Sequence, residues 1–344
     1  MQKILIKWWP LIIVLILFFV FLAQLMNLFF LESVKSANSS EKILFSKKMN
    51  IALQLNQSLD KNILLEFNAI SKQIIKKKEI LIKEPIRINK QNLKINVTAQ
   101  SGLVVDLKTG KKLWEKNFQE KRSIASLTKL MSALIFLETN PSLEKKIKIT
   151  KKDEIGGARL NVNFSEDILV NDLFHAGLIG SKNNAILALA RFTGMSKENF
   201  VKKMNKKAQV IGLKNTHFVD PSGLDSKNLS TAEDVLKLAK QVFKNQEIKK
   251  ILVTNKYQFF TFLNNKKARA IVVENTNELL SKLKIEAGKT GFSNEAGSCL
   301  VIQIKNEYGN EILAVLLGNK TKEINFQEME KLIKWIFENY KWQE

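Results

Sequence analysis

Ser101-Gly102-Leu103-Val104-Val105-Asp106 contains a short apolar run that is typical of a buried strand. The next residues, Lys108-Thr109-Gly110-Lys111, have the composition of a hairpin turn. Leu113-Trp114-Glu115-Lys116 then predicts the returning strand. The folded part of the chain is therefore expected to begin with a β-hairpin.

Downstream of this hairpin, the pattern changes to helices and then returns to strands. Apolar residues recur at helical spacing in four segments: 126–138, 173–192, 197–211 and 231–243. The last of these opens with Thr231 and Asp234, which resemble a capping box. Apolar strands are predicted at 298–305 and 311–317, and an amphipathic helix at about 325–340. Strands at both ends with helices between them indicate an α+β domain.

Upstream of the hairpin, residues 1–31 predict a cytoplasmic tip and a transmembrane anchor. The chain is almost wholly apolar from Trp8 to Leu31, and about 20 apolar residues suffice to cross a bilayer as a helix. Lys3 and Lys7 precede this run, which favours an N-terminus in the cytoplasm and the remainder outside the plasma membrane. A cleaved signal peptide is the alternative, but its apolar core usually spans about 7–15 residues.

Between the anchor and the folded domain, residues 32–95 are polar and rich in lysine, with apolar residues at helical spacing. This pattern predicts a helical stalk or linker. The three expected parts are thus an anchor over 1–31, a stalk over 32–95 and an α+β domain over 96–344.

Composition sets further limits on the type of protein. The 344 residues are 45% hydrophobic, enough for a proper core, and their formal net charge is +22. A basic surface could bind nucleic acid, anionic lipid or an anionic polymer. The positive charge is equally explained by a general preference of the source genome for lysine. The single cysteine, Cys299, rules out an intrachain disulfide, and His175 and His217 lie far apart in sequence. Neither a metal site nor a cofactor is expected.

Ser126-Leu127-Thr128-Lys129 opens the first predicted helix with a hydroxyl and an amine. Positions i and i+3 share a helix face, so Lys129 Nζ is expected to approach Ser126 Oγ. A serine hydroxyl is a poor nucleophile without a base in reach, and lysine serves as that base when its pKa is lowered. The motif alone is weak, because an N-cap serine and a surface lysine explain it equally well.

Ser181-Lys182-Asn183 is the second short motif, in a loop before a helix. In an S-x-N element the serine relays protons toward the leaving group, and the asparagine holds the substrate backbone and the lysine base. Alone, an ordinary helix cap would explain the three residues.

The third motif, Lys289-Thr290-Gly291, precedes Phe292 on a strand-like stretch. It offers a cation, a hydroxyl for a substrate carboxylate, and a glycine that lets substrate backbone approach closely. All three motifs in this order are far less probable by chance than any one of them. Together they match the set shared by penicillin-binding proteins and active-site-serine β-lactamases.

From about Ala99 to its end the sequence resembles the serine-type D-alanyl-D-alanine carboxypeptidases, the low-molecular-mass penicillin-binding proteins. The resemblance extends beyond the three motifs, through 104–110, 124–131 and 212–225. It implies a β-lactamase/transpeptidase-like fold over 96–344, an acyl-enzyme at Ser126, and no metal or cofactor. The implied substrate is a peptidoglycan stem peptide ending in D-Ala-D-Ala, with β-lactams as acylating inhibitors.

The resemblance also implies roles for individual residues. The catalytic residues would be Ser126, Lys129 and Ser181. The substrate-binding residues would be Asn183, Lys289, Thr290, Gly291 and Phe292. The backbone N–H groups of Ser126 and Phe292 would form the oxyanion hole.

Two positions depart from the family pattern. Asn184 replaces an aspartate that usually follows the S-x-N motif, which concerns a structural contact. Asn325 aligns with an arginine that helps many members bind the terminal carboxylate, so Lys289, Thr290 and either Lys320 or Lys322 must do that work. The choice between DD-carboxypeptidase and DD-endopeptidase activity therefore stays open.

Other functions are less consistent with the sequence. Class A β-lactamases hydrolyse their acyl-enzyme with a glutamate-activated water, and no glutamate occurs between Asn199 and Ala232, where it would lie. A non-catalytic wall-binding protein would not need the intact motif residues. Nucleic-acid binding is the weakest alternative, because the predicted anchor places the basic surface outside the cytoplasm.

Overall fold

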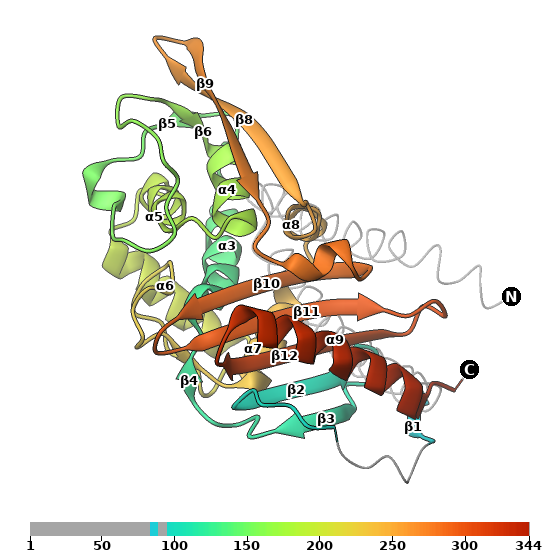
Figure 1. Ribbon diagram of the computed structural model, residues 1–344. Coiled ribbons are helices and arrows are strands. Elements are labelled where there is room, and N and C mark those ends of the chain that lie inside the picture. Colours follow the sequence, from blue (N-terminus) through green and yellow to red (C-terminus); the bar gives the residue numbers. More distant parts are fainter. Residues whose placement is uncertain (1–82, 89–94, 344) are drawn as a thin grey trace, which may run out of the picture. The chain divides into compact units, whose positions relative to one another are not determined.

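A computed structural model describes residues 83–88 and 95–343, which belong to one compact unit, Ile82–Glu344 (Figure 1). The predicted anchor and all but the last few residues of the predicted stalk lie outside these described ranges. Within them, no helix is both long enough and apolar enough to span a bilayer. The anchor and the stalk therefore stay predictions.

Five antiparallel strands form the central sheet, in the order β10-β11-β12-β2-β3 (Figure 1). Their bounds are Ser101–Asp106 (β2), Lys112–Lys116 (β3), Ile285–Ser293 (β10), Gly297–Lys305 (β11) and Glu311–Asn319 (β12). The predicted β2–β3 hairpin is present, and its turn places Gly110 at a φ of 77°, which glycine adopts at little cost. Both predicted C-terminal strands are present as β11 and β12.

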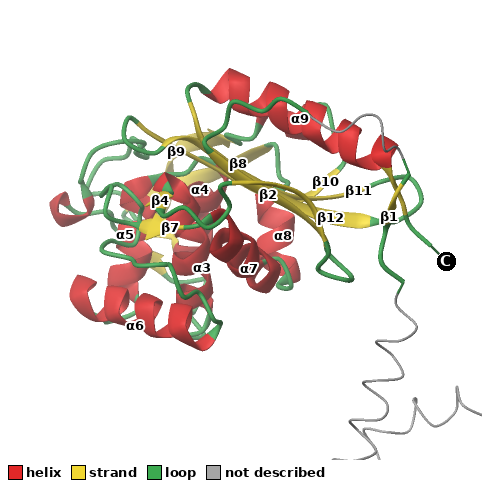
Figure 2. Cartoon of the chain, turned by 90° about the horizontal axis from the view of Figure 1, so that it is seen from below, coloured by secondary structure: helices red, strands yellow, loops and turns green. Residues whose placement is uncertain are grey.

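Helices cover both faces of the sheet, so β12 is buried on each side (Figure 2). Helix α9 (Lys322–Asn339) packs on one face, where it meets Ile312, Ala314 and Leu316. Leu313, Val315 and Leu317 point into the second core, which the other helices share. The alternation follows from the two-residue period of a strand and explains why its sequence is continuously apolar.

The second face carries the remaining helices of the described unit. Their bounds are Lys129–Leu137 (α3), Val170–Ile179 (α4), Asn183–Phe192 (α5), Lys197–Val210 (α6), Ala232–Val242 (α7) and Gln246–Leu252 (α8). Helix α7 begins as predicted, with the Thr231 hydroxyl accepting from the Asp234 amide. The Asp234 carboxylate accepts from Asn215 and Thr216, so it does not complete a capping box with Thr231.

Two of the predicted helices differ from the structure. The segment predicted at 126–138 begins with a 3-10 turn, η2 (Ala125–Thr128), and α3 starts only at Lys129. The left-handed backbone of Ala125, with a φ of 44°, precludes an α-helical start there. The segment predicted at 173–192 is two helices, because Ser181 adopts a φ of 56° and interrupts the helical backbone.

A hairpin that the sequence analysis did not identify extends beyond the main sheet (Figure 1). Strands β8 (Lys256–Leu263) and β9 (Lys266–Glu274) pair around Asn264 and Asn265, whose φ values of 51° and 62° suit a two-residue hairpin turn. The hairpin is tied to the loop before Ile168 by an ion pair of 3.2 Å between Arg269 and Glu166.

Short elements complete the described unit. The strand pairs are β1 (Ile86–Arg87) with β13 (Tyr340–Lys341), β4 (Arg122–Ser123) with β7 (Leu229–Ser230), and β5 (Lys146–Ile147) with β6 (Ile168–Leu169). Two further 3-10 turns are η3 (Lys151–Asp153) and η4 (Glu278–Ser281).

Candidate active site

Ser126 lies in turn η2, partly exposed, where the N-terminus of α3 meets the edge strand β10. Strand β10 approaches the turn so closely that a methyl group on Gly291 would lie 2.9 Å from the Ile124 carbonyl oxygen. The same methyl would lie 3.0 Å from the Ser126 amide nitrogen. Glycine is therefore required at position 291 if the strand is to lie against the serine.

Lys129 lies under this serine with its side chain fully buried. Its Nζ donates to Ser126 Oγ at 2.7 Å, as the i, i+3 spacing predicts. It also donates to Asn183 Oδ1 at 2.7 Å and to the Ser222 carbonyl oxygen at 2.6 Å. Three acceptors thus fix the amine at hydrogen-bond distance from the hydroxyl it would activate.

The surroundings of Lys129 favour its neutral form. Burial lowers the pKa of Lys129 well below its ordinary value, and the nearby ammonium of Lys289 lowers it further. The Asp220 carboxylate raises it, but this effect is smaller than the other two. In its neutral form the amine donates its two N–H groups to Asn183 and the Ser222 carbonyl and turns its lone pair toward Ser126 Oγ, so Lys129 is equipped to take a proton from Ser126.

Asp220 organises the loop that supplies the Ser222 carbonyl. Its buried carboxylate accepts from the amides of Ser222, Gly223 and Asp225 and from two side chains, Ser222 Oγ and Asn228 Nδ2. Burial raises the pKa of Asp220, but these hydrogen bonds outweigh burial and hold its pKa below the usual value. The sequence analysis did not identify this residue as part of the site.

The S-x-N motif connects α4 to α5 beside the two lysines. Ser181 Oγ accepts from Lys289 Nζ at 3.0 Å, and the left-handed backbone at Ser181 turns this side chain out of the helical path. Asn183 uses its Oδ1 for Lys129, while its Nδ2 donates to the Gly156 carbonyl at 2.9 Å. Ser181 and Asn183 thereby contact different lysines from the ends of one three-residue turn.

Lys289 is the second buried lysine, on strand β10. Besides Ser181, its Nζ donates to the Thr290 carbonyl at 2.9 Å. Burial lowers the pKa of Lys289 to about 7. Thr290 remains partly exposed, and the Phe292 side chain is exposed.

The two departures from the family pattern have clear structural outcomes. Asn184 is buried and bonds both backbone groups of Leu160 and the Glu154 carboxylate, so it holds the loop beside Asn183. Asn325 is also buried and donates to Ser298 Oγ at 3.0 Å. It supplies no charge, whereas Lys322 Nζ lies 5.4 Å from the Phe292 ring centre.

The structure therefore brings the predicted residues together. Ser126, Lys129 and Asn183 form one hydrogen-bonded group, and Ser181 and Lys289 form an adjoining pair. Gly291 lies directly against the Ser126 turn. The fold thus brings together around Ser126 residues that lie 54 apart in the chain, Lys129 and Asn183, and 108 apart, Ser181 and Lys289.

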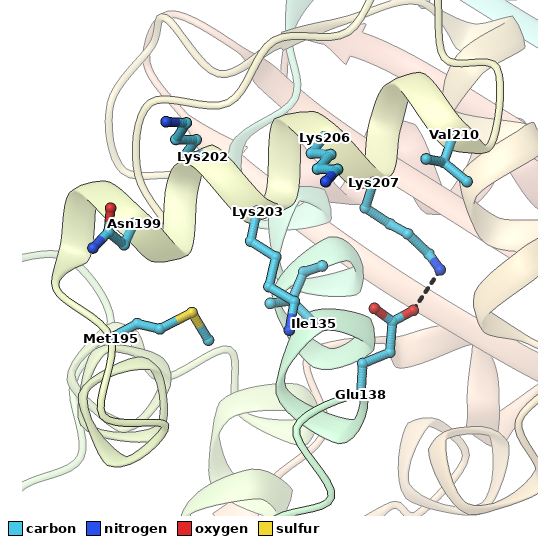
Figure 3. Close-up of a pocket in the computed structure, with 9 residues that line it drawn as sticks. All are labelled: Ile135, Glu138, Met195, Asn199, Lys202, Lys203, Lys206, Lys207 and Val210. Atoms are coloured by element: carbon cyan, nitrogen blue, oxygen red, sulfur yellow. Dashed lines mark ion pairs between the residues drawn. The ribbon is translucent and has the colours of Figure 1, made fainter.

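A groove of about 510 Å³ lies apart from this site, between α3 and α6 (Figure 3). It contains none of the predicted site residues. Its lining residues are Ile135, Glu138, Met195, Asn199, Lys202, Lys203, Lys206, Lys207 and Val210. Glu138 pairs with Lys207 at 2.5 Å.

The sequence matches known proteins of one kind. Residues 87–321 match the family model described as D-alanyl-D-alanine carboxypeptidase. The chain is 34% identical over 253 residues to the D-alanyl-D-alanine carboxypeptidase DacF of Bacillus subtilis, covering 70% of this chain and 63% of DacF. It is 32% identical over 246 residues to the D-alanyl-D-alanine endopeptidase of Escherichia coli, covering 70% of this chain and 77% of that protein.

Solved structures agree with the sequence comparison. The Streptomyces K15 DD-transpeptidase is 27% identical, with a TM-score of 0.68 over 71% of this chain and 99% of that one. Penicillin-binding protein D2 from Listeria monocytogenes, solved in its cefotaxime-bound form, is 28% identical, with a TM-score of 0.63 over 71% and 99% of the two chains. The predicted α+β transpeptidase-like fold is therefore confirmed.

Proposed function

The chain belongs to the D-alanyl-D-alanine carboxypeptidase family, and we propose that it acts on peptidoglycan stem peptides. In the proposed reaction it removes the terminal D-Ala through an acyl-enzyme at Ser126. One observation carries the proposal: Lys129 Nζ, fully buried, lies 2.7 Å from Ser126 Oγ. A lysine in this environment is the base that a serine nucleophile needs.

In the proposed mechanism, neutral Lys129 takes the proton of Ser126 as Oγ attacks the carbonyl carbon of the penultimate D-Ala. The resulting oxyanion accepts from the backbone N–H groups of Ser126 and Phe292. The proton taken up by Lys129 then passes through the Ser181 hydroxyl, which is held by Lys289, to the departing amine, so D-Ala leaves and Ser181 regains the proton it gives. Water next attacks the acyl-enzyme and gives a proton to Lys129, which returns it to Ser126 Oγ as the shortened peptide is released.

Recognition of the terminal carboxylate is assigned to the residues of strand β10. Lys289 supplies positive charge and Thr290 a hydroxyl, and Lys322 adds a second cation near Phe292. Asn325 is excluded from this role because it is buried against Ser298.

The second candidate is a DD-endopeptidase that cuts peptide cross-links. It is favoured by the same uncharged Asn325, since a weaker carboxylate site suits an internal bond better than a chain end. Three similar proteins are also named D-alanyl-D-alanine endopeptidases. Both candidates use the same acyl-enzyme.

The test is to incubate the full-length protein separately with a stem pentapeptide and with a cross-linked dimer. Release of D-Ala that disappears in Ser126→Ala supports the carboxypeptidase. Cleavage of the dimer without release of D-Ala supports the endopeptidase. Steady-state hydrolysis of penicillin without a lasting adduct would contradict both and indicate a β-lactamase.

We further propose that residues 1–31 anchor the protein in the plasma membrane with the catalytic domain outside. The supporting feature is the apolar run from Trp8 to Leu31. Full-length protein should remain in membranes washed with alkaline carbonate, whereas a chain beginning at residue 32 should be released. Release of both would refute the anchor.

A further inference from the structure

Thr276 lies beside the carboxylate-binding strand but belongs to none of the three motifs. It follows β9 in the segment that leads to η4, and its Oγ1 is 2.5 Å from Thr290 Oγ1. Both threonines are partly exposed. Each of these hydroxyls has one proton, so only one of the two protons can lie between the oxygens.

The backbone around Thr276 is fixed on both sides. The Thr276 amide donates to the Ile179 carbonyl at 3.2 Å, which ties it to the end of α4 just before the S-x-N motif. The Asn275 side chain donates to the carbonyls of Leu252 and Thr254 and accepts from the Asn277 amide. The position of the Thr276 hydroxyl is therefore set by the fold.

The direction of the shared hydrogen bond decides what Thr290 can offer a ligand. If Thr290 donated to Thr276, the acceptor left for the Thr276 proton among the described residues would be the Ile179 carbonyl, 3.5 Å away, at the limit of a hydrogen bond. If Thr276 donates, the Thr290 proton is available to an acceptor in the site. An anionic ligand at Thr290 selects the second arrangement, because a carboxylate only accepts hydrogen bonds.

We propose that Thr276 is a positioning residue that donates to Thr290 Oγ1 and so directs the Thr290 proton to the terminal carboxylate of the substrate. The inference rests on the proposed function, in which Thr290 binds that carboxylate. It makes Thr276 a determinant of specificity for substrates that end in a free carboxylate.

The experiment compares Thr276→Val, which removes the hydroxyl but keeps the shape, with Thr276→Ser, which keeps the hydroxyl. Thr254→Val is the matched control, since its hydroxyl donates to the Lys250 carbonyl in the preceding helix turn and not to a site residue. The full-length variants are assayed on a stem pentapeptide with a free terminal carboxylate and on the same peptide with a terminal amide. KM and kcat are measured for both.

Thr276→Val should raise KM for the free acid about three- to tenfold, the effect of one neutral hydrogen bond, with little change in kcat. The amide should be processed as by the wild type, and so should both peptides by Thr276→Ser and Thr254→Val. Equal losses on both peptides, no loss on the acid, or a Thr276→Ser defect as large as that of Thr276→Val would overturn the proposal.

A second pair of ligands separates this inference from the proposed function. If the wild type releases no D-Ala, the proposed function fails, and the rates of covalent labelling by benzylpenicillin and its methyl ester are compared instead. A loss in Thr276→Val confined to the free acid supports the positioning role. Equal labelling of wild type and variant by the acid overturns it.

Discussion

The lysines of the active site and the lysines of helix α6 differ in their burial and in their hydrogen-bond partners. Lys129 and Lys289 are fully buried between α3, the S-x-N turn and β10, and each of their amines has defined acceptors. Four lysines of α6, Lys202, Lys203, Lys206 and Lys207, line an open groove, and Lys207 is the one of these four with an ion-pair partner among the described residues (Figure 3). Burial lowers the pKa of a lysine and thereby allows it to act as a base.

The free-energy cost of burying an ammonium group distinguishes the two regions. An ammonium group loses hydration when it is buried, so burial favours the neutral amine at both Lys129 and Lys289. Lys202 and Lys206 on α6 are exposed to water.

Replacing the buried base should nearly abolish acylation. Lys129→Met removes the proton acceptor beside Ser126, and loss of a general base typically costs about 100- to 10,000-fold in rate. The rate of labelling by a fluorescent penicillin measures the loss. The matched change on α6, Lys203→Met, should label like the wild type. Equal labelling by both variants would remove the distinction between the two regions.

Disrupting the environment of Lys129 without touching the lysine should also be costly. Asp220→Ala leaves five donors without their acceptor, so the loop that presents the Ser222 carbonyl should rearrange. We expect a loss of about 2–4 kcal/mol in the free energy of unfolding and slower acylation. Urea unfolding and penicillin labelling measure these effects.

The control for that variant is Asp225→Ala, which loses one hydrogen bond to the Lys227 amide in an exposed turn. It should cost well under half as much stability. A larger loss in Asp225→Ala would show that Asp220 does not organise the loop.

The pH dependence of stability should reveal the buried charge of Lys289. Its pKa is about 7 in the folded protein and 10.5 for an ordinary lysine, so the unfolded chain binds more protons between these values. Stability should therefore rise with pH from about 7 to 10.5, with up to about 1.4 kcal/mol per pH unit from this one group. Lys289→Met should flatten that rise in urea unfolding series. An unchanged slope would mean that Lys289 is not buried as a costly cation.

The smallest effect is expected on α6. Lys202 and Lys206 lie four residues apart on one face, so Lys206→Glu replaces a repulsive pair with an attractive one. The free energy of unfolding should rise by about 0.5 kcal/mol, and the gain should shrink at high salt. A loss of acylation in this variant would connect the groove to the active site and show that the two groups of lysines are not independent.

The local part of the site was predictable from the sequence. Ser126 and Lys129 are three residues apart, so helical geometry alone brings them together, even though the first turn is 3-10. Strand β12 was predictable as well, because its continuous apolar run reflects burial on both faces of the sheet.

The contacts that set the environment of Lys129 could not be predicted from sequence patterns, because they join residues far apart in the chain. Ser222 lies 93 residues from Lys129 and contributes a backbone carbonyl, which no residue type signals. Thr276, which contacts Thr290, follows a hairpin that the sequence analysis did not identify, although asparagines such as Asn264 and Asn265 favour turns. Ala125 and Ser181 adopt left-handed backbones that their residue types do not favour, so tertiary packing had to impose them.

If Ser126 is the nucleophile, a penicillin forms its covalent adduct on this residue. Peptide mapping of the adduct tests this directly. Full-length protein is treated with benzylpenicillin, digested and analysed by mass spectrometry, beside the Ser126→Ala variant. We predict a single benzylpenicilloyl group on the peptide that contains Ser126 and no adduct in the variant. An adduct on another residue, or one that persists in Ser126→Ala, would contradict the account.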